Sequence, residues 1–259
     1  PTVCEGSSTS FSNTSTISSG TMTYSWDFGD GTTSSQRNPV HTYTAGGTYT
    51  ALLTTTSQHG CADTQTVAVI VRSAPLADAG IDQNICEGNS LTLTAAGGSS
   101  YLWSPGNQTT ATISVTPTTN TQFTVTVTDA NGCSATDQVA VNILTPPVAM
   151  VSNDQSICSG EAVSLNGSGA GTLSWMPGGS SASSITVQPS TTSQFILTVT
   201  DLNGCIDRDT VQVIVNPLPS LVAGPDQTIC SGSSVALTAS GATSYSWFPG
   251  GSSNPTMIL

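Results

Sequence analysis

Apolar and polar residues alternate with a period of two through most of the chain. Residues 91–94 read Leu-Thr-Leu-Thr, residues 123–128 read Phe-Thr-Val-Thr-Val-Thr, and residues 139–143 read Val-Ala-Val-Asn-Ile. This period places successive side chains on opposite faces of a strand, so the apolar positions face a core and the threonines face water. No stretch shows the 3.6-residue period of an amphipathic helix. The pattern predicts an all-β fold built from short strands.

The same pattern recurs every 72 residues. The string QFTVTVTDANGC at 122–133 is followed 72 residues later by QFILTVTDLNGC at 194–205. Single cysteine, tryptophan and aspartate positions repeat at the same spacing: Cys86, Cys158 and Cys230; Trp103, Trp175 and Trp247; Asp82, Asp154 and Asp226. Self-similarity at a fixed period indicates a row of similar structural units.

The repeat and the prolines between its copies divide the chain into four segments. We expect domains at 1–74, 75–146, 147–218 and 219–259, the last of them incomplete, with short and semi-rigid Pro-containing joints. Six or seven short strands in about 72 residues are typical of a β-sandwich. Each segment has one tryptophan on a strand near its middle, which we expect to be a core residue. The prediction is a set of tandem Ig-like β-sandwiches in an elongated array.

Composition removes several classes of function. The chain has 42 Thr and 39 Ser, no Lys, three Arg and a formal net charge of -12. It cannot neutralise a row of phosphates or a negatively charged membrane surface, so neither nucleic acid nor membrane is an expected partner. No window holds 18 apolar residues, so no membrane-spanning segment is expected. Disorder is the other interpretation of such polar composition, but the regular alternation argues against it.

Seven cysteines indicate an oxidising compartment. The repeat register predicts three disulfides within segments, Cys4–Cys61, Cys86–Cys133 and Cys158–Cys205. Each of the last two closes a loop worth about 4 kcal/mol in the chain-entropy model. Cys230 is left over, and we expect its partner near position 277 of a longer protein; a free thiol or an intermolecular bridge are the alternatives. There is no CxxC pair for zinc. Disulfides favour a secreted or cell-surface protein.

The remaining polar residues predict no catalytic centre. The two histidines, His41 and His59, have no triad context, and no nucleophile, metalloprotease or nucleotide motif is present. We therefore expect no enzyme activity, no catalytic residues, no metal ligands and no cofactor. One alternative concerns aspartates beside the joints, Asp82, Asp154 and Asp226, and the pair Asp27 and Asp30: such carboxylates either form turns or bind Ca²⁺, which prefers six to eight oxygen ligands.

The first segment resembles the PKD domain family. The residues that carry the resemblance are Trp26-Asp27-Phe28-Gly29-Asp30-Gly31, followed by Asn38-Pro39-Val40-His41-Thr42-Tyr43 and Gly47-Thr48-Tyr49. The resemblance covers about residues 1–72. It implies an Ig-like β-sandwich that serves as an extracellular spacer or binding module.

The later segments resemble the Ig-like repeats of very large Bacteroidota surface proteins. The resemblance lies in DQxICxG, the W-x-PG turn and TQFTVTVTDANGC, and it covers residues 75–259. It implies a cell-surface protein of the type 9 secretion and gliding-adhesin kind. The cysteine pairs depart from true immunoglobulin domains, because they are expected to join a loop to a turn.

Three functions are consistent with these features. The first is a structural stalk or filament segment, whose partners are neighbouring repeats or subunits of the same fibre. The second is direct adhesion to surface glycans or proteins. The third is an accessory role beside the catalytic domain of a secreted hydrolase. A further alternative is that a neighbouring subunit donates the strands that the last segment lacks.

Overall fold

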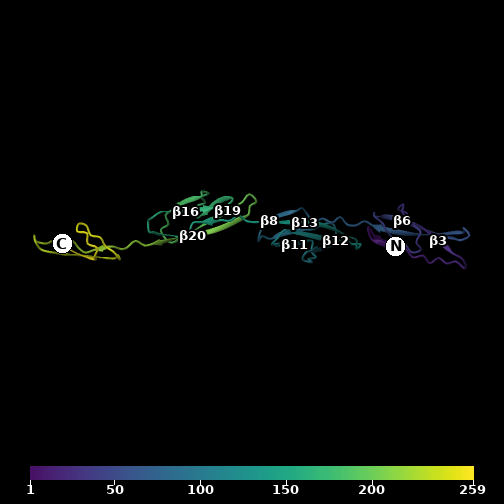
Figure 1. Cartoon of the computed structure of the whole chain (residues 1–259), viewed down its shortest axis with the longest axis horizontal. Helices are drawn as coiled ribbons and strands as arrows, with labels where there is room; N and C mark the ends of the chain where they lie inside the picture. Colours follow the sequence, from purple (N-terminus) through teal and green to yellow (C-terminus); the bar gives the residue numbers. More distant parts are fainter. The chain divides into compact units, whose positions relative to one another are not determined.

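All regular elements of the chain are β-strands. The computed structural model describes residues 1–259, and its 23 named elements include no helix (Figure 1). It accordingly contains no helix long and apolar enough to span a membrane. The chain divides into two compact units, Pro1–Thr145 and Pro146–Leu259. The predicted all-β class is confirmed.

Residues 1–74 form two sheets. The larger sheet has the strand order β1-β7-β6-β3-β4, and the smaller one pairs β2 with β5. The strands are β1 (Thr2–Cys4), β2 (Ser8–Ser10), β3 (Met22–Asp27), β4 (Thr33–Ser34), β5 (Val40–Thr42), β6 (Gly47–Ser57) and β7 (Ala62–Arg72). The first strand runs parallel to the last, with Cys4 opposite Arg72. The residue that ends β1 therefore lies at the C-terminal end of β7.

An aromatic cluster fills the space between these two sheets. Phe11, Trp26, Phe28 and Tyr43 are all buried, together with apolar residues of β6 and β7. The residue after Phe28 must be glycine, because Gly29 has a φ of +78° and an added Cβ would lie 2.7 Å from the Thr50 carbonyl oxygen. The predicted core role of Trp26 is confirmed.

Residues 75–145 form a second sandwich. One sheet has the order β10-β12-β13-β8, and the other pairs β11 with β9. The strands are β8 (Gln83–Cys86), β9 (Leu91–Thr94), β10 (Ser100–Ser104), β11 (Thr112–Val115), β12 (Thr121–Thr128) and β13 (Ser134–Leu144). Here too the first strand is parallel to the last, with Cys86 opposite Leu144.

The alternating residues of this sandwich point as the sequence predicts. Phe123, Val125 and Val127 of β12 are buried, whereas the threonines between them are partly exposed. Trp103 has no exposed surface and packs in the same cluster as residues of β9 and β11 on the facing sheet. The core role predicted for this tryptophan is confirmed.

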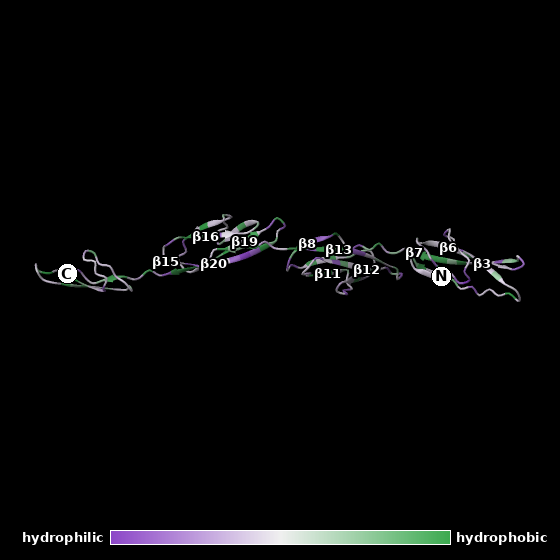
Figure 2. Ribbon diagram, viewed as in Figure 1, coloured by the Kyte–Doolittle hydropathy of each residue, from purple (hydrophilic) through white to green (hydrophobic).

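The second unit repeats this plan. Its sheets have the orders β15-β20-β19-β17 and β14-β16-β18. The strands are β14 (Met150–Val151), β15 (Gln155–Cys158), β16 (Val163–Ser168), β17 (Thr172–Met176), β18 (Ser184–Val187), β19 (Ser193–Thr200) and β20 (Ile206–Asn216). The pair Phe195↔Val211 stands where Phe123↔Val139 stands in the previous repeat. Trp175 is fully buried, and Figure 2 shows hydrophobic and hydrophilic residues together along β20.

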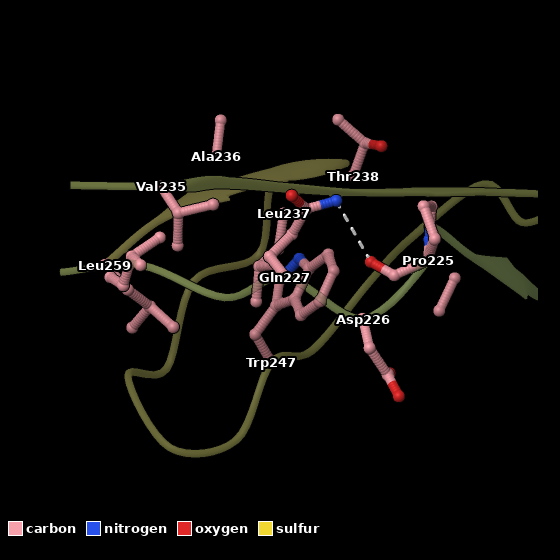
Figure 3. Close-up of a pocket in the computed structure, with 12 residues that line it drawn as sticks. Pro225, Asp226, Gln227, Val235, Ala236, Leu237, Thr238, Trp247 and Leu259 are labelled. Carbon is pink, nitrogen blue, oxygen red and sulfur yellow. Dashed lines mark hydrogen bonds between the residues drawn. The ribbon is translucent and has the colours of Figure 1, made fainter. Parts of the chain in front are cut away.

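Residues 219–259 form only a three-stranded sheet, with the order β21 (Val222–Ala223), β22 (Ala236–Ser240) and β23 (Thr256–Ile258). A cavity of about 530 Å³ lies beside it, lined by Val235, Leu237, Trp247 and Leu259 among others (Figure 3). These residues correspond by the 72-residue register to 75–115, so they contain no counterparts of β12 and β13. The cavity is therefore the open core of a partial sandwich, and Trp247 is only partly buried.

Candidate functional site

The two cysteines of each sandwich lie at opposite ends of its longest strand. The first cysteine ends a strand that is parallel to the last strand. In the strand register, Cys4 lies opposite Arg72, Cys86 opposite Leu144 and Cys158 opposite Asn216. The second cysteine immediately precedes that last strand, β7, β13 or β20, each 11 residues long. Ten residue steps of an extended strand cover roughly 33 Å. A disulfide requires Cα atoms within about 7 Å of each other.

The predicted pairing of cysteines within segments is therefore wrong. Cys4 is bonded to Cys133, with an S–S distance of 2.02 Å and a Cα–Cα distance of 5.5 Å. This bond joins the first sandwich to the second and excludes both Cys4–Cys61 and Cys86–Cys133. Cys158 is a free, exposed thiol, which excludes Cys158–Cys205; Cys61 and Cys230 are also free and exposed. Cys86 and Cys205 are both disulfide-bonded.

The turn that carries Cys133 is held by an aspartate. The Asp129 carboxylate accepts hydrogen bonds from the backbone N–H groups of Asn131, at 2.8 Å, and Cys133, at 2.9 Å. The Asp129 N–H in turn donates to the Cys133 carbonyl oxygen at 2.9 Å. The N–H of Cys133, together with Asn131 and the positive charge of Arg72, lowers the pKa of Asp129. The turn therefore fixes the backbone from which the bonded sulfur projects.

A second contact lies beside the disulfide. The Arg72 guanidinium donates a hydrogen bond from Nη1 to the side-chain oxygen of Asn131. Arg72 ends β7 opposite Cys4, and Asn131 lies two residues before Cys133. One side-chain hydrogen bond and one covalent bond therefore join the same two places. We call this set, Cys4, Arg72, Asp129, Asn131 and Cys133, the joint.

The turn of the joint is present in all three complete sandwiches. The Cys205 N–H donates to the Asp201 carboxylate at 2.8 Å, and the Asp201 N–H donates to the Cys205 carbonyl oxygen at 3.0 Å. In the first sandwich Ser57 replaces the aspartate, and the Cys61 N–H donates to its hydroxyl oxygen at 3.2 Å. The repeated TDxNGC string is the signal for this turn. Sequence reasoning recognised the turn but gave its cysteine the wrong partner.

The aspartates near the Pro-containing linkers accept hydrogen bonds from backbone N–H groups. The Asp82 carboxylate accepts from the Ala140 N–H and the Asp154 carboxylate from the Gln212 N–H, both at 2.8 Å. The Ala79 N–H donates to Asp137 at 2.8 Å and lowers the pKa of that carboxyl. No group of three or more His, Cys, Asp or Glu side chains in residues 1–259 is arranged to hold a metal ion.

The aspartates of the first sandwich form part of a small polar network. Asp27 accepts from the Gly29 N–H at 2.9 Å, which is the turn role considered for it. Asp30 lies 2.7 Å from His41 Nε2 and accepts from the Thr32 hydroxyl at 2.7 Å. Burial raises the pKa of Asp30, but the hydrogen bonds from Thr32 and His41 outweigh it and leave this pKa below its ordinary value.

This network is anchored on the aromatic cluster. The His41 ring stacks on Phe28 with centroids 4.1 Å apart. The Tyr43 hydroxyl donates to the Phe28 carbonyl oxygen at 3.1 Å, and burial, with Asp30 and Tyr49 nearby, raises the pKa of Tyr43 to about 12. The histidine, in the middle of β5, thus packs against the aromatic cluster.

Comparison with known proteins identifies the first sandwich. Residues 1–71 match the PKD domain family. That match covers the WDFGDG segment and the polar network around Asp30. Residues 1–71 are therefore a PKD domain, and Ig-like β-sandwiches follow it.

Curated relatives match only short stretches of this chain. Collagenase ColA of Bacillus cereus is 43% identical over 54 residues, which are 21% of this chain and 6% of the collagenase. Pre-pro-metalloprotease PrtV of Vibrio cholerae is 44% identical over 68 residues, which are 25% of this chain and 7% of that protein. The matched stretch thus spans less than a tenth of either relative.

Solved structures of tandem Ig domains resemble the chain at low similarity. Extracellular domains 3–5 of Drosophila OTK align with 83% of this chain and 94% of their own, at 11% identity and a TM-score of 0.33. The eight N-terminal Ig domains of Down Syndrome Cell Adhesion Molecule align with 95% of this chain and 39% of their own, at 10% identity and a TM-score of 0.36.

Proposed function

We propose that this chain is a non-catalytic stalk segment of a secreted or cell-surface protein. The joint supports this function most directly, because a spacer that only linked independent domains would not need a covalent bond between them. Disulfides of this kind form and persist in oxidising compartments. The polar outer faces of the strands are those of domains that stand in water.

The side chains offer little for direct adhesion. Phe248 is the one exposed aromatic residue, whereas no Trp or Tyr residue is exposed. The indole N–H groups of Trp103 and Trp175 donate to carbonyl oxygens of their own sandwiches at 3.1 and 3.0 Å. Aromatic residues buried in this way contribute to the core and are not available as a binding surface. A stalk therefore fits these residues better than a glycan-binding module.

Small-angle X-ray scattering tests the stalk. A compact chain of this length would have a radius of gyration of about 18 Å. Sandwiches in a row, each about as long as its 11-residue strands at roughly 36 Å, would give about 40 Å. We expect the larger value, unchanged between two protein concentrations. A value close to 18 Å would show that the sandwiches fold back on one another and do not form a stalk.

We assign the stalk to the type 9-secreted, gliding-adhesin-like surface proteins of the Bacteroidota. The motifs DQxICxG and TDxNGC support this assignment by resemblance. Its test is the amount of the protein on the source cells after the type 9 secretion channel is inactivated. We expect the protein to disappear from the surface, and undiminished display would refute the export route.

An accessory role beside a secreted protease is the second candidate. It is favoured by the 43–44% identity with segments of a collagenase and a metalloprotease. In this role the chain would hold the catalytic domain near an insoluble protein substrate. Cosedimentation of the purified chain with collagen fibres is the test. Retention that a urea-unfolded sample lacks would favour this role over the stalk, and recovery in the supernatant would exclude it.

A further inference from the structure

The joint connects two points that lie far apart in sequence but near the two ends of the first unit. Cys4 is the last residue of β1, and Cys133 immediately precedes β13, the last strand of the unit. The sequence separation between them is 129 residues. Most buried residues of both sandwich cores, including Trp26 and Trp103, lie in the stretch between the two cysteines, whereas Val139 and Val141 of β13 lie outside it.

We propose that the Cys4–Cys133 disulfide makes the first unit a covalent tension bypass. A pull that enters at Pro1 and leaves at Thr145 travels through residues 1–4, the disulfide and residues 133–145. The stretch 5–132 carries no tension, because it is a closed loop on the side of this path. The biological use of the bypass rests on the proposed stalk function, but the bypass itself follows from the connectivity.

The strands on this path are suited to carry tension along their own length. β1 pairs in parallel with β7, and β13 lies between β12 and β8. Tension that enters β13 at Cys133 and leaves it at Leu144 stretches one strand from end to end. It does not pull β13 away from its neighbours, so no ladder of hydrogen bonds has to break.

The polar contacts of the joint keep this path short. Asp129 fixes the backbone of Cys133, and the Arg72–Asn131 hydrogen bond holds the end of β7 against the turn. Arg72 is opposite Cys4, so this bond supports the disulfide from its other side. These residues position the cysteines and are not themselves on the covalent path.

Single-molecule pulling of the full chain tests the bypass. One handle is attached at the N-terminus and the other at position 145 through a non-canonical residue, so that no cysteine is added and only the first unit is loaded. In the oxidised protein we expect a final extension of about 60 Å, the length of the short path at about 3.5 Å per residue. In Cys4→Ser the extension should grow by about 450 Å, because 129 residue steps are released.

Two controls keep the outcome clear. Cys61→Ser removes a free and exposed thiol, and it should leave the short extension of the wild type. Addition of a reductant to the folded wild-type protein under constant load should produce the same total gain of about 450 Å, which covers the case in which Cys4→Ser fails to fold. Release of the full length by the oxidised wild type would overturn the bypass. That result would remove the joint as support for the stalk, but the scattering test, which does not depend on the disulfide, would still decide the stalk separately.

Discussion

The cysteine pairing can be decided with trypsin, because the chain has only three cleavage sites. Cleavage after Arg37, Arg72 and Arg208 yields peptides 1–37, 38–72, 73–208 and 209–259. Cys4 lies in the first peptide, Cys61 is alone in the second, and Cys133 lies in the third. The structure places Cys4 5.5 Å from Cys133 between Cα atoms. Cys61 lies at the far end of β7, roughly 33 Å away along the strand.

The assay uses unreduced protein whose free thiols are first blocked with N-ethylmaleimide and which is then denatured and digested. We expect peptide 1–37 to be joined to peptide 73–208, and peptide 38–72 to be recovered alone with one maleimide on Cys61. Reduction before digestion is the control and should separate all four peptides. A disulfide between 1–37 and 38–72 would refute both the joint and the strand geometry from which it follows.

The cores and the polar network give three further predictions. Trp103→Ala and Trp175→Ala should each lower the free energy of unfolding by about 3–5 kcal/mol, measured by urea titration, because both indoles are fully buried. The pKa of Asp30 is lower in the folded state than in the unfolded state. The ionised Asp30 carboxylate therefore contributes its full stabilisation at pH values above the unfolded pKa, and this contribution is lost as the pH falls through the folded pKa. Asp30→Asn should reduce the loss of the free energy of unfolding over this acidic pH range. Since the pKa of Tyr43 is raised to about 12, stability should fall as the pH rises from about 10 toward 12, and Tyr43→Phe should remove that dependence; ultraviolet absorbance of the phenolate follows the titration.

The strands and cores could be predicted from the sequence because they are local properties. Alternation in residues 123–128 decides which side chains face inward without any knowledge of the partner strand. The repeat then carries that result to residues 195–200, and Trp103 and Trp175 are found in the cores as expected. The polar network of the PKD domain was only partly visible, since the proximity of Asp30 and His41 depends on how β5 returns to the turn after β3.

The disulfides depend on a property that the repeat spacing does not contain. A constant spacing shows that Cys86 and Cys158 occupy equivalent places, but it does not show which two places are close in space. The deciding quantity is the relative direction of two strands. A cysteine that leaves the first strand and a cysteine that enters the last strand lie at the same end of a sheet only if those strands are antiparallel. In all three complete sandwiches the strand that ends in the first cysteine is parallel to the last strand.

Parallel first and last strands therefore favour a bond between the two sandwiches of the first unit. The first cysteine lies where the last strand ends and the chain leaves for the next sandwich. The turn before the last strand of that next sandwich carries the second cysteine, and in the first unit the two meet as Cys4 and Cys133.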